Sequence, residues 1–441
     1  MYCRETTGDR LVTARLLIMP SKTPNASITA VWIFVIAFAI RLGISLVNIS
    51  SLEADTDAYR RLSQTMYHAG TFGLIDPQGI PMASAYRPPL YPWLLSWFGG
   101  LKSDQISIAI LHALLGGLSV AMTFDIAKRL GMAQGPSLAT STLVLIDPIL
   151  IRQSTLVMTE TTATFLSIAI WWLTLVVGWF TTQSLGRSVI LGTLLGVALG
   201  ITCLCRPTAV AWCALWGAAE VFRSPVRASC LLLGCLLVLI PWWKRNELQL
   251  GQGVWTTTHG GYTLLLANNP ILYEHWKTDL SREWDEDRFH AWWRSKQLEK
   301  FNQDSPDEIV LDTFANQLAW ESIRKSPAMF AKACLIREGW LWAWWPSKRQ
   351  ADTKVSLALG FYYAAVSIAA LRGLYSLLRS NGKHRILWLP ALTLALSLCC
   401  VHAVYWSNMR MRAPAIPLVS LLAVMGCGSF SKEPYWDARI Q

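Results

Sequence analysis

Long apolar runs alternate with short charged loops along most of this chain, and these runs predict helices that cross a membrane. Ten runs have about the roughly 17 to 25 residues that a spanning helix needs. They are residues 28–50, 105–126, 136–151, 156–180, 187–204, 206–222, 228–243, 353–378, 386–406 and 413–430. The run 136–151 is short for a span, and only Cys205 divides the fifth run from the sixth. A Pro- and Trp-rich run at 88–100 is too short to span, so we interpret it as an interfacial or re-entrant helix.

The composition agrees with this pattern. Of the 441 residues, 53% are hydrophobic and only 15% are charged, and the mean hydropathy is +0.34. Soluble proteins carry roughly 25% charged residues. The predicted fold class is therefore an all-α polytopic membrane protein with about ten spans.

The basic residues predict the orientation in the membrane. Arg4, Arg10, Arg15 and Lys22 place the N-terminal tail in the cytoplasm. Ten spans then bring the other basic loops, such as Lys128–Arg129, to the same side and leave both termini cytoplasmic. The net charge of +11 thus follows largely from this bias and requires no nucleic-acid partner.

The spans divide the chain into predicted segments. Two long polar stretches fall on the extracytoplasmic side, and each contains helical patterns, at Ala58–Ala69, Arg282–Lys300 and Asp307–Lys325. The segments are a cytoplasmic tail 1–27, an N-terminal membrane module 28–243 with the external loop 51–104, an external helical segment 244–352, the C-terminal membrane helices 353–430 and a tail 431–441.

Charges gather at the predicted extracytoplasmic ends of the spans. Charge at a membrane boundary is costly and is a sign of function. These residues are Asp55, Asp57, Arg87, Glu160, Arg206, Arg245, His259 and Arg410. Neither these residues nor the ten cysteines have the spacing of a metal site, so we expect no metal.

Short motifs follow one another in order around these charges. The first is Asp55-x-x-x-Tyr59, followed by Tyr86-Arg87-Pro88-Pro89-Leu90-Tyr91-Pro92. The others are Thr159-Glu160, Arg206-Pro207-Thr208, Pro241-Trp242-Trp243-Lys244-Arg245-Asn246, Gly260-Gly261 through Asn268-Asn269-Pro270, and Arg410-Met411-Arg412-Ala413-Pro414. This ordered set resembles the C-type superfamily of membrane glycosyltransferases that use polyprenyl-phosphate sugars, among them the protein O-mannosyltransferases and the aminoarabinose transferases. Leu90 and Met411 stand where that family has Gly and Tyr.

The resemblance implies an inverting glycosyltransferase of the cell envelope. Its donor would be a monosaccharide on a polyprenyl phosphate in the bilayer, and its acceptor a hydroxyl of a protein, lipid or polysaccharide. No other cofactor is implied. Asp55, with Asp57 second, would take the acceptor proton. Arg245 and Arg410, then Arg206 and Arg87, would neutralise the leaving phosphate, because a guanidinium matches phosphate oxygens.

The residues themselves leave alternatives open. Asp57 also fits a helix N-cap, and Glu160, which would hold an arginine or the sugar, also suits a helix N-terminus. Arg87 and Arg206 fit side chains that reach toward lipid headgroups equally well. His259 is placed at the donor phosphate or the acceptor, although a lone loop histidine is more often incidental. The rival functions are a transporter of lipid-linked sugars and an inactive scaffold of the same fold.

Overall fold

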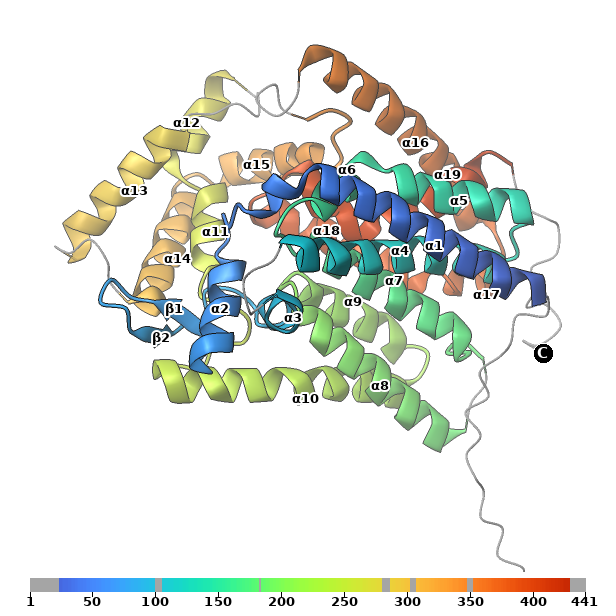
Figure 1. The fold of residues 1–441 in the computed structure, drawn as a ribbon. Coiled ribbons are helices and arrows are strands. Elements are labelled where there is room, and N and C mark those ends of the chain that lie inside the picture. Colours follow the sequence, from blue (N-terminus) through green and yellow to red (C-terminus); the bar gives the residue numbers. More distant parts are fainter. Residues whose placement is uncertain are drawn as a thin grey trace, which may run out of the picture.

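Helices account for nearly all regular structure in this computed structural model, which describes residues 24–99, 105–181, 184–279, 286–301, 307–346 and 352–428 (Figure 1). Much of each predicted tail lies outside these residues. The first membrane helices follow the predicted order. Their long aliphatic runs form helices because the bilayer core contains no water, so the backbone N–H and C=O groups must bond to each other within the helix. Their bounds are α1 Pro24–Val47, α4 Gln105–Arg129, α7 Glu160–Val176, α8 Leu185–Cys203, α9 Ala209–Val221 and α10 Pro225–Leu250.

The run predicted as one span at 136–151 is two helices. Helix α5 covers Gln134–Ile146 and helix α6 covers Pro148–Ser154. Pro148 has no N–H to continue the first helix, and Asp147 caps the second through the Leu150 N–H. Arg41 of α1 donates hydrogen bonds to the carbonyls of Val144 and Leu150 at this break, at 2.9 and 2.8 Å. Arg41 therefore pairs inside the protein.

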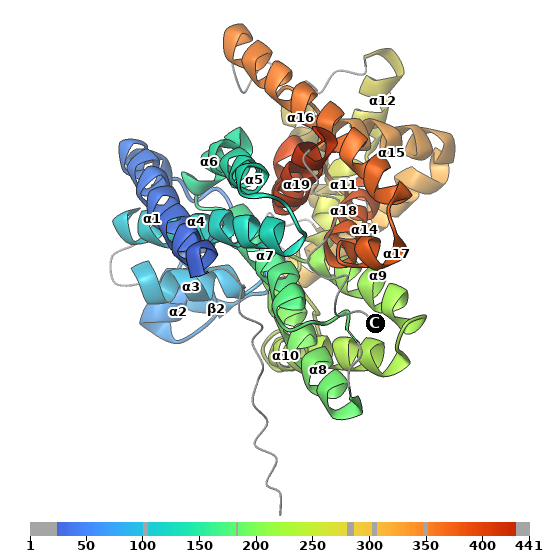
Figure 2. The ribbon, with the colours of Figure 1, turned by 90° about the vertical axis from the view of Figure 1, so that its right-hand side faces the viewer.

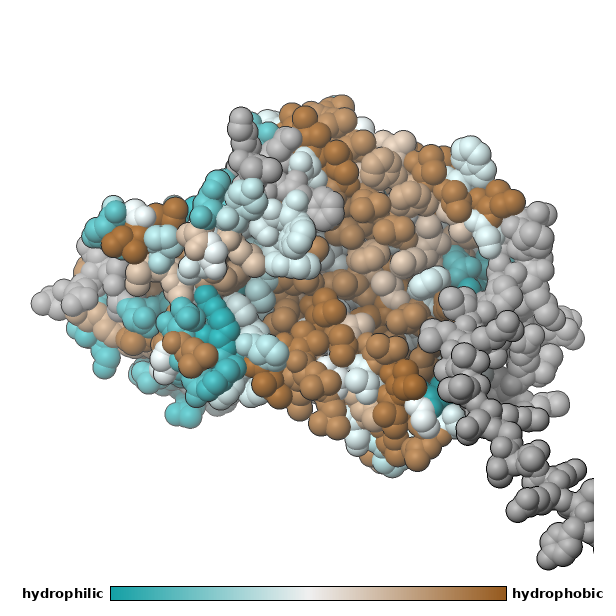
Figure 3. Space-filling model, turned by 60° about the horizontal axis from the view of Figure 1, so that its bottom comes forward, coloured by the Kyte–Doolittle hydropathy of each residue, from teal (hydrophilic) through white to brown (hydrophobic). Residues whose placement is uncertain are grey.

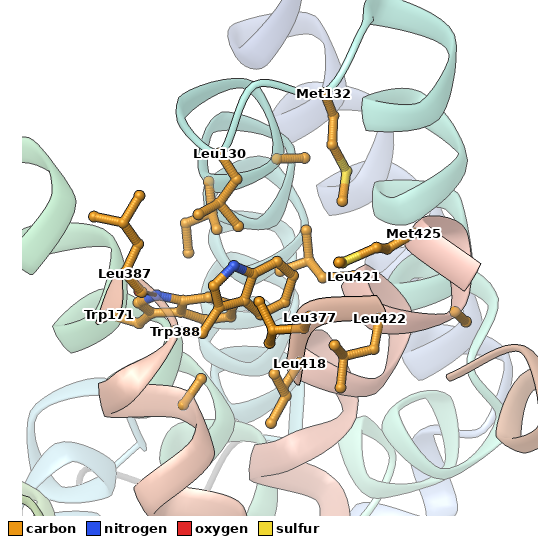
Figure 4. Close-up of a cluster of buried hydrophobic side chains, with 14 of the residues drawn as sticks. Leu130, Met132, Trp171, Leu377, Leu387, Trp388, Leu418, Leu421, Leu422 and Met425 are labelled. Carbon is orange, nitrogen blue, oxygen red and sulfur yellow. Dashed lines mark hydrogen bonds between the residues drawn. The ribbon is translucent and has the colours of Figure 1, made fainter. Parts of the chain in front are cut away.

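The C-terminal helices pack back onto the first ones. Trp171 of α7 donates a hydrogen bond to the Leu387 carbonyl at 2.8 Å, and its ring lies beside that of Trp388 (Figure 4). Leu377 and Leu421 complete this buried cluster from two further helices. The C-terminal elements are α16 Thr353–Arg379, α17 Gly382–Ile386, α18 Leu389–Val404, the 3-10 helix η2 Met409–Ala415 and α19 Ile416–Gly426.

The external loop contains the predicted helix and also a small hairpin. The elements are η1 Ile49–Leu52, α2 Tyr59–Ala69, the antiparallel strands β1 Gly73–Ile75 and β2 Pro81–Ala83, and α3 Leu90–Gly99. Helix α3 confirms a short helix within the run 88–100. The all-α prediction is therefore correct apart from two three-residue strands.

The external segment is helical, as predicted. Its helices are α11 Gly260–Ala267, α12 Pro270–Thr278, α13 Glu286–Phe301, α14 Glu308–Lys325 and α15 Pro327–Leu341. The Asn-Asn-Pro motif forms the corner between the first two. Asn269 accepts a hydrogen bond from the Leu272 N–H and so caps α12, whereas Asn268 donates to the carbonyl of Val404, the last residue of α18. The motif thus ties the external segment to the membrane bundle.

The surface is that of a membrane protein. Hydrophobic residues cover the middle of the face in Figure 3, and hydrophilic residues gather at one end. In Figure 2, which looks at the end carrying α17, helices α1, α8 and α16 lie on the outside of the bundle. Among the described residues, 6 helical stretches are long and apolar enough to cross a membrane, and α7, α9 and α18 are shorter apolar helices. The total of about ten spans stays a prediction.

Candidate active site

Asp55 lies at the start of α2, in the loop that follows the first membrane helix. Its Oδ1 accepts a hydrogen bond from the Arg60 N–H at 2.9 Å, and its Oδ2 accepts one from the Arg61 N–H at 3.0 Å. Two otherwise unpaired helix donors are thereby satisfied, which is the work of a capping carboxylate. The cap considered for Asp57 is therefore made by Asp55, whose side chain stays 15% exposed.

Asp57 forms an ion pair with Arg87, which brings together two residues thirty positions apart. Arg87 Nη2 is 2.7 Å from Asp57 Oδ1, and its Nε donates to the Asp57 carbonyl at 3.2 Å. The next residue, Ala58, has φ +62°, the sole positive φ among the described non-glycine residues. Such a conformation is costly for alanine and persists where the surroundings hold it. It turns the chain sharply between Asp57 and the helix.

Glu160 lies between two arginines that are distant in the sequence. Its Oε1 is 3.3 Å from Arg206 Nη1 and 3.6 Å from Arg410 Nε, and its side chain is only 3% exposed. Glu160 Oε2 is buried and has no hydrogen-bond partner within the described residues. One carboxylate and two guanidinium groups leave an excess of one positive charge. A positively charged cluster around a buried carboxylate suits an anion such as a phosphate.

Tyr59 connects the Asp57–Arg87 pair with the Glu160 cluster. Its ring is buried, and the Arg87 guanidinium lies 5.8 Å from the ring centroid. Burial raises the pKa of its hydroxyl, and the charges of Arg87, Asp57, Glu160 and Arg206 are near enough to influence that pKa.

A chain of aromatic contacts supports the Tyr59 ring from behind. The ring packs edge-on against Tyr91, at 5.1 Å between centroids. The Tyr91 hydroxyl lies 2.8 Å from Nε2 of His112, whose Nδ1 lies 2.9 Å from the Ser154 carbonyl. Because a carbonyl only accepts, Nδ1 carries the proton and Nε2 accepts from Tyr91. Sequence reasoning missed His112, since a lone histidine in an apolar helix gives no signal.

Arg245 lies elsewhere, with its guanidinium directed at the external loop. It donates to the Ser84 carbonyl at 2.8 Å, to the Phe72 carbonyl and to Asn246 Oδ1 at 2.9 Å. It also lies over the rings of Phe72 and Trp242. These contacts hold the loop against α10, and the ion pairs of the Glu160 cluster do not include Arg245.

His259 is partly buried in an aromatic row beside the Asp57–Arg87 pair. Its ring is 4.8 Å from that of Tyr86 and 5.0 Å from that of Tyr262. Burial, and then the Arg87 charge, lower its pKa to about 3. His259 is therefore neutral near pH 7 and does not present a cation to a phosphate.

This chain is similar to known membrane glycosyltransferases in part of its sequence and in its fold. Residues 79–247, which are 169 of the 441, match the model of the dolichyl-phosphate-mannose-protein mannosyltransferase family. The oligosaccharyltransferase of Archaeoglobus fulgidus, in its apo form, has 13% sequence identity and a TM-score of 0.51 over 89% of this chain and 50% of that one. This chain has the C-type glycosyltransferase fold. The resemblance drawn from the motifs is confirmed.

Two further structures belong to ArnT from Cupriavidus metallidurans. The complex with undecaprenyl phosphate has 14% identity and a TM-score of 0.39 over 90% of this chain and 77% of that one. The apo structure has 15% identity and a TM-score of 0.40 over 92% and 78%. No curated protein sequence matches the chain.

The region of this C-type fold that matches the family model contains Arg87, Glu160, Arg206 and Arg245. His402 of α18 lies outside that region. Its Nδ1 is bonded to the Trp406 carbonyl at 3.0 Å, and its buried Nε2 has no partner within the described ranges. It interacts electrostatically with Arg206 and Glu160.

Across the part of the chain that the structure describes, no group of three or more His, Cys, Asp or Glu side chains is arranged to hold a metal ion.

Proposed function

We propose that this protein is an inverting glycosyltransferase that moves a monosaccharide from a polyprenyl-phosphate donor to a hydroxyl acceptor at the extracytoplasmic side of the membrane. The single observation that carries the proposal is the buried Glu160 cluster, in which two arginines share one carboxylate. The matched family is named for a donor of this chemical class, a sugar on a lipid phosphate.

The leaving phosphate would bind at the arginines of that cluster. As the acceptor oxygen attacks the anomeric carbon, the bond from this carbon to the phosphate oxygen breaks, and its electron pair stays on the phosphate. Arg206 and Arg410 neutralise that growing charge, because their guanidinium donors are fixed in place before the reaction. A phosphate leaves readily as an anion, so no general acid is needed.

A carboxylate of the external loop would take the proton of the acceptor. Both oxygens of Asp55 accept backbone N–H groups, which hold the carboxylate in one orientation while each oxygen keeps a lone pair. Asp57 is the second candidate, and its use as a base requires that Arg87 move toward the donor phosphate. A positioned base contributes typically 10²- to 10⁴-fold to the rate.

The helix directions support an extracytoplasmic site. Helix α7 begins at Glu160, and α8 ends just before Arg206, so both residues are at the bundle end where α1 leads into the Asp55 loop. The opposite ends of α4 and α16 carry Arg129 and Arg379. Surplus Lys and Arg mark the cytoplasmic side. The loop of Asp55 would then face outward, together with the external helices.

The test uses purified protein in nanodiscs with radiolabelled polyprenyl-phosphate monosaccharides and membrane extract as the acceptor source. We expect sugar transfer from one donor, a loss of roughly 10²-fold or more in Asp55→Asn, and unchanged donor binding in that variant. Transfer that survives Asp55→Asn but not Asp57→Asn moves the base to Asp57. Movement of lipid-linked sugar across proteoliposomes without transfer supports a transporter, and neither activity supports an inactive scaffold.

A further inference from the structure

The short segment from Ser84 to Arg87 carries the arginine that pairs with Asp57, and it is held from several directions. Arg245 of α10 donates to the Ser84 carbonyl. The Thr258 N–H donates to the Ala85 carbonyl at 2.9 Å, and the Thr257 hydroxyl donates to the Tyr86 carbonyl. These contacts fix the backbone that precedes Arg87.

The strongest hold on this segment comes from the external segment. Glu308, in the first turn of α14, accepts a hydrogen bond from the Ser84 hydroxyl at 2.7 Å through one oxygen. Its other oxygen accepts one from the Ala85 N–H at 2.7 Å. The Ser84 hydroxyl oxygen in turn accepts from the Tyr86 N–H at 2.9 Å. Hydrogen bonds to a carboxylate are about twice as strong as neutral ones.

One turn along α14, a second carboxylate holds the other side of the same region. Asp312 accepts from the Gly261 N–H at 2.6 Å and from the Tyr262 N–H at 3.2 Å. These residues begin α11 directly after His259, whose ring packs on Tyr86. Glu308 and Asp312 therefore hold both sides of Tyr86, and the Arg87 guanidinium lies over the Tyr86 ring at 4.5 Å.

We propose that Glu308 is a positioning residue that holds Ser84 and Ala85 and thereby keeps Arg87 beside Asp57, next to the Glu160 cluster that would bind the donor phosphate. This inference rests on the proposed function, because it assigns a phosphate to the site. It makes the external segment part of the active site. It also gives a role to a charged residue of the helical pattern predicted at Asp307–Lys325.

The test is a double-mutant cycle on the binding of radiolabelled undecaprenyl phosphate to the full-length protein in detergent. Loss of hydrogen bonds to a charged group costs on the order of tenfold or more. We expect Glu308→Ala to weaken binding by about that factor in the wild-type background and less than about twofold when Arg87→Ala is already present. Glu308→Gln, which keeps the side-chain volume and one acceptor, should lie in between.

The control is Glu321→Gln at the exposed end of the same helix, where the carboxylate pairs with Lys325. It should leave binding unchanged. Two results would overturn the positioning role and leave the proposed function standing. One is an equal loss of affinity from Glu308→Ala in the wild-type and the Arg87→Ala backgrounds. The other is wild-type affinity in both Glu308→Gln and Glu308→Ala when these variants are folded. If the wild-type protein binds neither undecaprenyl phosphate nor dolichyl phosphate, the proposed function fails, and this inference fails with it.

Discussion

Replacing Glu160 by glutamine removes the one negative charge that Arg206 and Arg410 share and leaves the side-chain shape nearly unchanged. The two ionic contacts, at 3.3 and 3.6 Å, are each worth about 5 kcal/mol at an effective dielectric constant near 20. The Arg410 side chain is 33% exposed, so solvent screens its share. Breaking a buried pair on one side costs about 3–5 kcal/mol, and we expect that loss in Glu160→Gln.

This loss is measurable as a change in the melting temperature. At about 2.1 cal/mol/K per residue, the unfolding entropy of 441 residues is near 0.9 kcal/mol/K. The expected decrease in Tm is therefore about 3–5 °C. If the arginines bind a phosphate, undecaprenyl phosphate should raise the Tm of Glu160→Gln more than that of the wild type, since the ligand then supplies the missing charge. A ligand at 100 times its Kd adds about 2.7 kcal/mol.

Glu220 provides a matched control at the opposite end of the bundle. Its side chain is 0% exposed and is 3.0 Å from Arg227 and 3.6 Å from Arg223. Glu220→Gln should lower the Tm by a similar amount without a larger response to the lipid. The reasoning is refuted if Glu160→Gln melts like the wild type, or if the lipid stabilises both variants equally.

Three further outcomes follow from the structure. Gly261→Ala places a Cβ against the Asp312 carbonyl oxygen and should lower both the Tm and the rate of sugar transfer. Gly260→Ala, which has open space around its Cβ, should lower neither. Equal effects of the two variants in thermal and transfer assays would contradict this. Since the folded-state pKa of His259 is about 3, unfolding takes up a proton below pH 6.5, so stability decreases by up to about 1.4 kcal/mol per pH unit from 6.5 toward 3. His259→Gln should flatten the dependence of Tm on pH between 7 and 5. Arg41→Met leaves buried carbonyls at the α5–α6 break unpaired and should lower the free energy of unfolding by about 2–4 kcal/mol, as measured by thermal denaturation. A variant as stable as the wild type would show that water replaces the guanidinium.

Much of the fold could be predicted because apolar length and turn chemistry are local properties. The helices from α7 to α10 begin and end close to the predicted runs, and the external helices α13 and α14 match their charged patterns within the described residues. The division of α5 from α6 was missed although Pro148 marks it. The apolar residues on both sides of Asp147 and Pro148 led to the prediction of a single span.

The side-chain roles were less predictable because they depend on contacts between distant segments. The roles of Asp55 and Asp57 depend on the turn at Ala58, whose positive φ no sequence rule assigns to alanine. Arg206 and Arg245 both follow apolar helices, yet one meets Glu160 and the other meets backbone carbonyls. Sequence shows that a charge is present at a helix end but does not show which way it points.

Arg41 has a consequence for how the chain is made. Its carbonyl partners lie 103 to 109 residues further along the chain, so the ribosome releases the first helix long before they exist. The Arg41 guanidinium thus enters the bilayer before its partners exist, and the apolar residues of the rest of α1 have to carry it there. Helix α1 reaches its final contacts only after α5 and α6 have been made.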